Sequence, residues 1–263
     1  MLFSHRERCS YAKSPLHEVI CQLRFPTILA IDTAEPAALQ EAVRGDFPRY
    51  AVQKEQPAPQ IVGVGTPNPR LEQAAPVTNY NFVSTDNLWK INLTRNFIAF
   101  STLSYHGWED FGKKLDKPLA QFIRIYSPAF FERIGLRYVN ITSRKALGLG
   151  NTPWAELFTP AYAGILTEED VRAEAILASG VDFTLKLDSS CQGKIHAGPG
   201  MLKANTPEAP ADTEQKFILD MDLSLAGNIP PVIAAGGLET LHGHATTLFE
   251  GAITDVMRAA LSK

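Results

Sequence analysis

Two arginines stand in an apolar segment that has the composition of a buried strand. Arg133 and Arg137 lie within FERIGLRYVN, residues 131–140. Because strand side chains alternate, one face of this strand takes the apolar side chains and the opposite face takes both arginines. Arg24 holds the corresponding position in the leading strand HEVICQLRF, residues 17–25. The three arginines therefore mark a face of the sheet that helices are not expected to cover.

Guanidinium groups on an open sheet face suit the binding of an anion, since the planar fork of arginine pairs with carboxylate or phosphate through two hydrogen bonds. Lys186, on a later predicted strand, alternates onto the same face. We therefore predict a binding site for a small anionic ligand or an acidic protein segment at Arg24, Arg133, Arg137 and Lys186. Ordinary cross-strand ion pairing with carboxylates on neighbouring strands is the alternative.

A pair of aspartates offers a second kind of chemistry. Asp220 and Asp222 alternate with apolar residues, so both carboxylates lie on one strand face and could reach a single cation. His242 and His244 cannot join them as a pair, because two helical positions separate the side chains by about 200°. His242 falls within the apolar stripe of its helix and His244 at the flank. The metal hypothesis therefore rests on Asp220 and Asp222.

Known catalytic motifs do not occur in the sequence in complete form. HEVIC, residues 17–21, lacks the second histidine of a zinc-binding HExxH motif and lies on a predicted strand. GLGNTP, residues 148–153, has proline where a dinucleotide-binding loop needs its third glycine. There is no GxSxG motif, and no cysteine has an obvious basic partner. The sequence favours a binding protein without catalysis of its own and implies no cofactor.

The composition is that of an ordinary soluble globular protein. The 263 residues are 45% hydrophobic and 20% charged, with a formal net charge of −3. This acidic balance disfavours tight nucleic-acid binding, which depends on neutralising phosphates. Aromatic residues of the first half could still stack bases on a saddle-like sheet, so a nucleic-acid binder stays as an alternative. These aromatic residues are Tyr80, Phe82, Trp89 and Phe100.

The sequence gives no sign of export or membrane insertion. The N-terminal MLFSHRERCSYAKSP mixes charges into its first residues and has no apolar core of a signal peptide. No window approaches the roughly 18 apolar residues that span a bilayer. Cys9, Cys21 and Cys191 are far apart and form no CxxC pair, which indicates reduced thiols. We expect a cytoplasmic protein without membrane contact.

Hydrophobic periodicity places these residues on a regular series of elements. The first half reads strand 17–25, a helix from Asp32 or Thr33 to 47, strands 79–85, 88–96 and 97–105, and a helix 108–126. Pro118 should kink or divide this last helix. Residues 52–78 hold five prolines and are predicted to form a loop, in which 61–65 could pair as an edge strand.

The second half repeats the order of the first. It reads strand 131–143, a helical segment 152–166 interrupted by Pro160, strands 171–188, 191–202 and 215–225, and a helix 238–262. We therefore predict an α+β fold in which a strand–helix–three strands–helix unit is pseudo-duplicated. Its curved, mostly antiparallel sheet should carry the helices on one face. The halves, 1–128 and 129–263, are expected to form one compact unit.

Several sequence blocks resemble a known family. SPLHEVICQLRFP near the start, GWEDF, RIGLRYVN and LHGHATTLFEGAIT near the end resemble a sporadically distributed prokaryotic protein family of unknown function. The resemblance covers nearly the whole chain, and RIGLRYVN is its most specific part. It implies a full-length member of one family and carries no activity or catalytic residue.

These observations favour a cytoplasmic binding protein that forms a homodimer. The arginine-bearing sheet face would engage an anionic ligand or an acidic protein segment. A metal-dependent hydrolase using Asp220 and Asp222 is the first alternative, and a nucleic-acid binder is the second.

Overall fold

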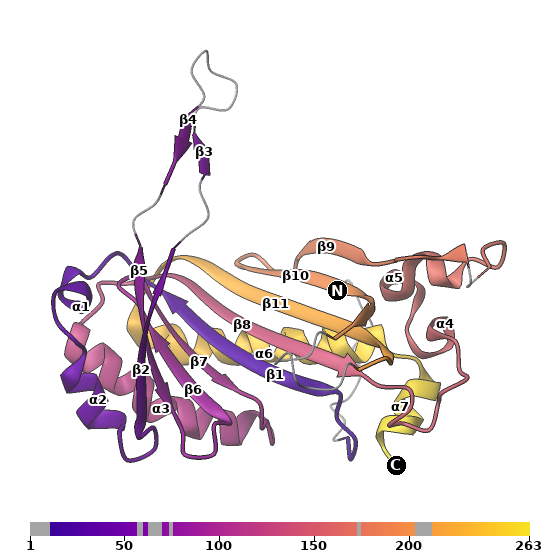
Figure 1. Cartoon of the computed structure of the whole chain (residues 1–263), viewed down its shortest axis with the longest axis horizontal. Helices are drawn as coiled ribbons and strands as arrows, with labels where there is room; N and C mark the ends of the chain where they lie inside the picture. The colour runs from indigo at the N-terminus through magenta and orange to yellow at the C-terminus, as the bar shows by residue number, and fades with distance from the viewer. Residues whose placement is uncertain (1–10, 57–59, 63–69, 74–75, 173–174, 203–211) are drawn as a thin grey trace. The chain divides into compact units, whose positions relative to one another are not determined.

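The computed structural model describes residues 11–56, 60–62, 70–73, 76–172, 175–202 and 212–263 (Figure 1). The strands are β1 (Leu16–Arg24), β2 (Arg49–Glu55), β3 (Gln60–Val62), β4 (Arg70–Glu72), β5 (Val77–Val83), β6 (Trp89–Leu93), β7 (Phe97–Thr102), β8 (Phe131–Thr142), β9 (Val181–Lys186), β10 (Cys191–Met201) and β11 (Gln215–Ile229). The helices are α1 (Leu29–Thr33), α2 (Ala37–Val43), α3 (Trp108–Tyr126), α4 (Trp154–Leu157), α5 (Pro160–Ala163), α6 (Ala234–Ala252) and α7 (Asp255–Leu261), with short 3-10 turns η1 (Gly164–Thr167) and η3 (Pro231–Ile233).

Nine of the strands form one open antiparallel sheet in the order β2-β5-β6-β7-β1-β8-β11-β10-β9, and helices pack against it. The predicted α+β class is confirmed. β3 and β4 pair separately as a two-stranded sheet. No helix within the described residues is long and apolar enough to cross a membrane.

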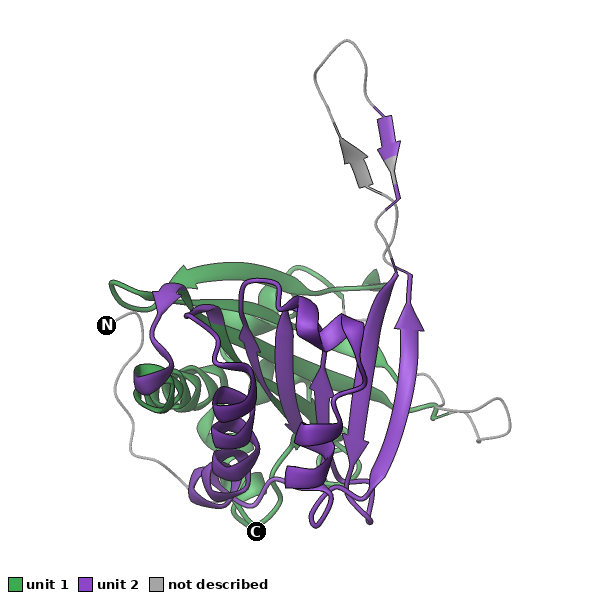
Figure 2. Ribbon diagram, turned by 90° about the vertical axis from the view of Figure 1, so that its left-hand side faces the viewer, with its two compact units in different colours: residues 1–20, 134–226, 233–263 green, residues 21–133, 227–232 purple. Residues whose placement is uncertain are grey.

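The chain divides into two compact units (Figure 2). Unit 1 contains residues 1–20, 134–226 and 233–263, and unit 2 contains residues 21–133 and 227–232. The predicted halves, 1–128 and 129–263, and the internal duplication stay predictions.

The core of unit 2 lies between α3 and the sheet. Phe25, just after β1, contacts Phe122 of α3, with ring centroids 4.9 Å apart. α3 is one helix of 19 residues, so Pro118 does not divide it, and the alternative of a kink at Pro118 stays a prediction. Pro118 is buried, as are Leu115 and Leu119 around it, and this packing holds the helix together although Pro118 donates no backbone hydrogen bond.

The core of unit 1 lies between α6 and the strands β8, β10 and β11. On β8 the residues Ile134, Leu136 and Tyr138 are buried while Arg137 is exposed, as the alternation predicted. Tyr138 Oη lies 2.8 Å from Nδ1 of His242 on α6. His242 is therefore a half-buried residue with a polar partner, on the helix face that meets the sheet.

The last helix was predicted as a single element, 238–262, and this prediction is wrong. α6 ends at Ala252 and α7 begins at Asp255. Between them Ile253 is extended and pairs with Phe158 as an isolated bridge, and Thr254 N donates to Leu157 O. Thr254 then caps α7, since its Oγ1 accepts from the backbone N of Met257 at 3.3 Å.

Other predicted elements differ in their bounds. The predicted loop 52–78 is wrong at both ends, because β2 continues to Glu55 and β5 starts at Val77. Within that stretch β3 pairs with β4, while part of the predicted edge strand 61–65 lies outside the described residues. Among the described residues of the strand predicted over 171–188, only β9, Val181–Lys186, is a strand.

Candidate functional site

A row of acidic and basic side chains crosses the sheet face of unit 1 that carries Arg137. His196 on β10 stands opposite Asp182 of β9 and opposite Asp220 of β11 in the strand register. His196 Nδ1 lies 3.0 Å from Asp182 Oδ1. Arg137 donates from Nε to Asp220 Oδ1 at 2.7 Å and from Nη2 to Oδ2. These hydrogen bonds with Asp220 raise the pKa of Arg137 above its ordinary value.

The Arg137 guanidinium thus already makes a bidentate interaction with the Asp220 carboxylate, the same interaction that an external anion would make. This contact is the cross-strand ion pairing that the sequence offered as the alternative to an anion site. Binding of an external anion at Arg137 would have to displace Asp220. The anion role of Arg137 stays a prediction.

The other predicted basic residues are divided between the two units of the chain. Lys186 is exposed on β9, and strands β10 and β11 separate it from Arg137 on β8. Arg24 and Arg133 belong to unit 2, whereas Arg137 and Lys186 belong to unit 1. The grouping of all four into one site therefore stays a prediction.

Asp220 and Asp222 share one face of β11, as the alternation predicted. Asp222 stands opposite Lys194 in the register, and Asp220 holds Arg137. Within the described residues neither aspartate joins two further side chains of metal-binding type in a close group. The metal role of the pair stays a prediction.

Replacing Arg137 by alanine should lower the free energy of unfolding by about 1 kcal/mol or less, because the pair is partly exposed to water. A double-mutant cycle of Arg137→Ala with Asp220→Asn, measured by urea unfolding, should give a coupling of roughly 0.5 to 1 kcal/mol. Lys186→Ala is the control and should leave stability nearly unchanged. A coupling of zero would contradict a structural ion pair and return Arg137 to the anion hypothesis.

A second site is a cavity of about 710 Å³ in unit 2. Its walls come from three lysines in one stretch of α3, from the turn between β5 and β6, and from the residues between α2 and β2. The lining residues are Asp46, Phe47, Ser84, Thr85, Asp86, Trp89, Lys113, Lys114, Lys117 and Pro118.

The charges in this cavity are only partly neutralised. Lys117 Nζ lies 2.6 Å from Asp46 Oδ2, but both side chains are more than half exposed. Lys114 Nζ lies 4.1 Å above the Trp89 ring and 3.8 Å from Oδ2 of the partly exposed Asp110. Within the described part of the chain Lys113 has no ion pair.

The carboxylate of Asp86 is held by its own turn. Its Oδ1 accepts from Ser84 Oγ and from the backbone N of Leu88. The hydrogen bond from Ser84 is the main reason that the pKa of Asp86 lies below its ordinary value, with the Leu88 N–H next. The cavity thus holds three ammonium groups and two carboxylates, one of which is committed to the turn.

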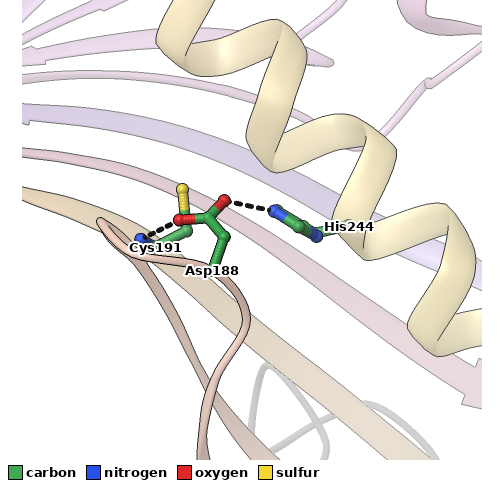
Figure 3. A group of neighbouring side chains, drawn as sticks. All are labelled: Asp188, Cys191 and His244. Carbon is green, nitrogen blue, oxygen red and sulfur yellow. Dashed lines mark hydrogen bonds and ion pairs between the residues drawn. The ribbon is translucent and has the colours of Figure 1, made fainter. Parts of the chain in front are cut away.

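A third group of side chains lies in unit 1, where the turn between β9 and β10 meets α6 (Figure 3). Asp188 Oδ1 accepts from the backbone N of Ser190 and of Cys191, each at 2.7 Å. Asp188 Oδ2 lies 2.7 Å from Nε2 of His244. The donor atoms of Asp188, Cys191 and His244 all lie within 4.8 Å of one another.

The electrostatics of this group argue against an activated thiol nucleophile. Burial, together with the nearby Asp188 carboxylate, raises the pKa of Cys191 to about 11. Desolvation acts to raise the pKa of Asp188, but hydrogen bonds from Ser190, His244 and Cys191 outweigh it and hold that pKa well below its ordinary value. Without a bound ion, the thiol is therefore protonated and unreactive at neutral pH.

Neither the cavity nor the Asp188 group was predicted from the sequence. Lys113 and Lys117 look like the solvated face of an amphipathic helix, and only their spacing beside a polar turn could have suggested a cavity. The spacing from Asp188 to Cys191 in a short turn was a usable signal for the other group. No pattern in the neighbouring sequence indicates that this turn contacts His244.

Comparisons of the chain with protein-family models, with curated proteins and with solved structures return no match. The family resemblance stays an expectation, and the arguments about function rest on the geometry of this chain.

Proposed function

We propose that the protein binds a small anionic ligand in the lysine-lined cavity of unit 2. The observation that carries this proposal is the convergence of Lys113, Lys114 and Lys117 on one concave space. The proposal keeps the class of ligand that the sequence favoured and moves the site from the sheet-face arginines to α3.

The volume of the cavity supports a small-molecule ligand, since such sites measure roughly 300 to 1,000 Å³. Lysine ammonium groups bind phosphate or carboxylate as compact point charges. Lys117 can turn from Asp46 to a ligand at little cost, because an exposed ion pair contributes on the order of 1 kcal/mol or less. The hydroxyl of Thr85 adds a hydrogen-bonding group among the lining residues. A di- or trivalent phosphate or carboxylate compound fits this set best.

Isothermal titration calorimetry with pyrophosphate and with citrate tests the proposal. At low ionic strength the unchanged protein should bind at least one probe, and Lys113→Met combined with Lys117→Met should weaken that binding by at least ~10-fold, with affinity falling as salt is added. Lys54→Met, an exposed lysine on β2 outside the cavity, is the matched control and should bind like the unchanged protein. If neither probe binds, or if Lys54→Met loses as much affinity, the cavity is not an anion site.

The remaining expectations from the sequence stay predictions: an acidic protein segment as partner, a hydrolase at Asp220 and Asp222, a nucleic-acid surface, a homodimer and a cytoplasmic location.

One observation supports self-association of the protein. β2 stands at the end of the strand order with every side chain exposed, and an uncovered edge strand can pair with another chain.

A further inference from the structure

We propose that Asp188, Cys191 and His244 bind a Zn²⁺ ion. This site lies in unit 1 and is independent of the anion cavity in unit 2. Figure 3 shows the three side chains directed toward one another, two from the β9–β10 turn region and one from α6.

The donor types match the ion. Zn²⁺ takes thiolate sulfur, imidazole nitrogen and carboxylate oxygen, with bonds of about 2.3 Å to sulfur and about 2.0 to 2.2 Å to nitrogen and oxygen. Those bond lengths place tetrahedral donor atoms roughly 3.3 to 3.6 Å apart. The three donor atoms already lie within 4.8 Å of one another. Side-chain movements that shift these atoms by on the order of 1 Å would bring them to tetrahedral distances.

The surroundings favour a fixed, neutral site. Cys191 is buried. The next residue on the same strand face is Gly193, and leucine side chains lie beside it: a Cβ added at Gly193 would be 3.3 Å from Leu187 Cδ1 and 3.7 Å from Leu248 Cδ1. Apolar neighbours make an unbalanced charge costly. Zn²⁺ with one thiolate and one carboxylate has no net charge, so the ion can be held in this partly buried place.

The turn holds two of the ligands before any ion binds. The backbone N of Cys191 donates to Asp188 Oδ1, and Leu187 N donates to Cys191 O at 2.9 Å. Asp188 Oδ2 is directed to His244 and not to the turn. Ser190 Oγ lies 3.1 Å from Asp188 Oδ1 and 4.0 Å from Cys191 Sγ. Three protein ligands leave a fourth position for a water molecule, which Ser190 could contact.

A plain hydrogen-bonded His–Asp pair without a metal is the competing explanation, and the chain contains a second such pair for comparison. His196 Nδ1 lies 3.0 Å from Asp182 Oδ1 on the open face, with side chains that are 47% and 67% exposed. No cysteine joins that pair within the described residues. The proposal therefore predicts metal binding that depends on His244 and Cys191 and is indifferent to His196.

The test is a titration of the metal-stripped full chain with Co²⁺, a spectroscopic substitute for Zn²⁺. A thiolate ligand gives a sulfur-to-cobalt charge-transfer band in the near ultraviolet, and Zn²⁺ should displace the cobalt and remove the band. Cys191→Ser should abolish the band, and His244→Gln should weaken cobalt binding by at least ~10-fold. His196→Gln is the matched control and should behave like the unchanged protein.

Circular dichroism of each metal-free variant checks that it is folded. If Cys191→Ser does not fold, His244→Gln carries the test because it retains the thiol. The proposal is overturned if the unchanged protein gives no band, or if the band survives in Cys191→Ser and so belongs to another cysteine. An equal loss in His196→Gln and His244→Gln would also overturn it.

Discussion

Replacing Arg258 by methionine should lower the free energy of unfolding by about 3 to 5 kcal/mol, because the change leaves a buried carboxylate without its cation. Glu250 near the end of α6 is only 2% exposed. Arg258 of α7 donates from Nη1 to Glu250 Oε2 and from Nη2 to the backbone O of Glu250. Tyr11 donates its hydroxyl to Glu250 Oε1 at 2.8 Å. These contacts join α6 to α7 across the break at Ile253. Urea unfolding of the variant measures the loss.

Two further variants separate this explanation from simple loss of an arginine. Asp255 also contacts Arg258, at 3.7 Å, but it is 91% exposed, so Asp255→Asn should change stability by less than about 0.5 kcal/mol. Glu250→Leu combined with Arg258→Met removes both charges and should recover most of the loss. A double variant no more stable than Arg258→Met alone would show that the buried charge is not the cause.

The sheet could be predicted because alternation is a local property of a strand. Leu136 and Arg137 are neighbours in the sequence, and their opposite exposure follows from strand geometry alone. The partner of Arg137 could be predicted only as a class, a carboxylate on a neighbouring strand. Which carboxylate it is depends on strand order and register, and these are set by the packing of the whole sheet.

The break at Ile253 shows where periodicity misleads. Ile253 and Met257 are both buried, so the apolar pattern continues through a position where the helix does not. The break comes from pairing with Phe158, which is far away in the sequence. A local signal was present, since Thr254 followed by Asp255 is a typical helix start.

The two candidate sites were missed for the same physical reason. Each depends on a contact between segments far apart in the chain, α3 with the β5–β6 turn in one case and α6 with the β9–β10 turn in the other. Residue types such as lysine, aspartate and histidine are common on solvated surfaces. Only the tertiary fold distinguishes a group of them from scattered ones.

Replacing Phe111 by alanine should cost about 3 to 5 kcal/mol of unfolding free energy, the usual loss for a buried aromatic side chain. Phe111 is fully buried in α3 and stands among four other rings. Its ring centroid lies 5.3 Å from that of Phe100, and Trp89, Tyr105 and Trp108 are each about 6 Å away. A cavity at this point has little chance to collapse, because large rings on several sides are held by separate elements.

Phe111 also contributes to the proposed anion site, because it packs against residues that line the cavity or adjoin its lysines. Trp89 lines the cavity and contacts Phe111, and Lys113 and Lys114 follow Phe111 in α3. Phe111→Leu fills most of the space and should cost less than about 1.5 kcal/mol while retaining pyrophosphate or citrate binding. Phe111→Ala should lose both stability and affinity, measured by urea unfolding and calorimetry. A free energy of unfolding for Phe111→Ala within about 1 kcal/mol of that of the unchanged protein would contradict this explanation. The aromatic cluster would then not fix α3 on the sheet, and it would not position the lysines.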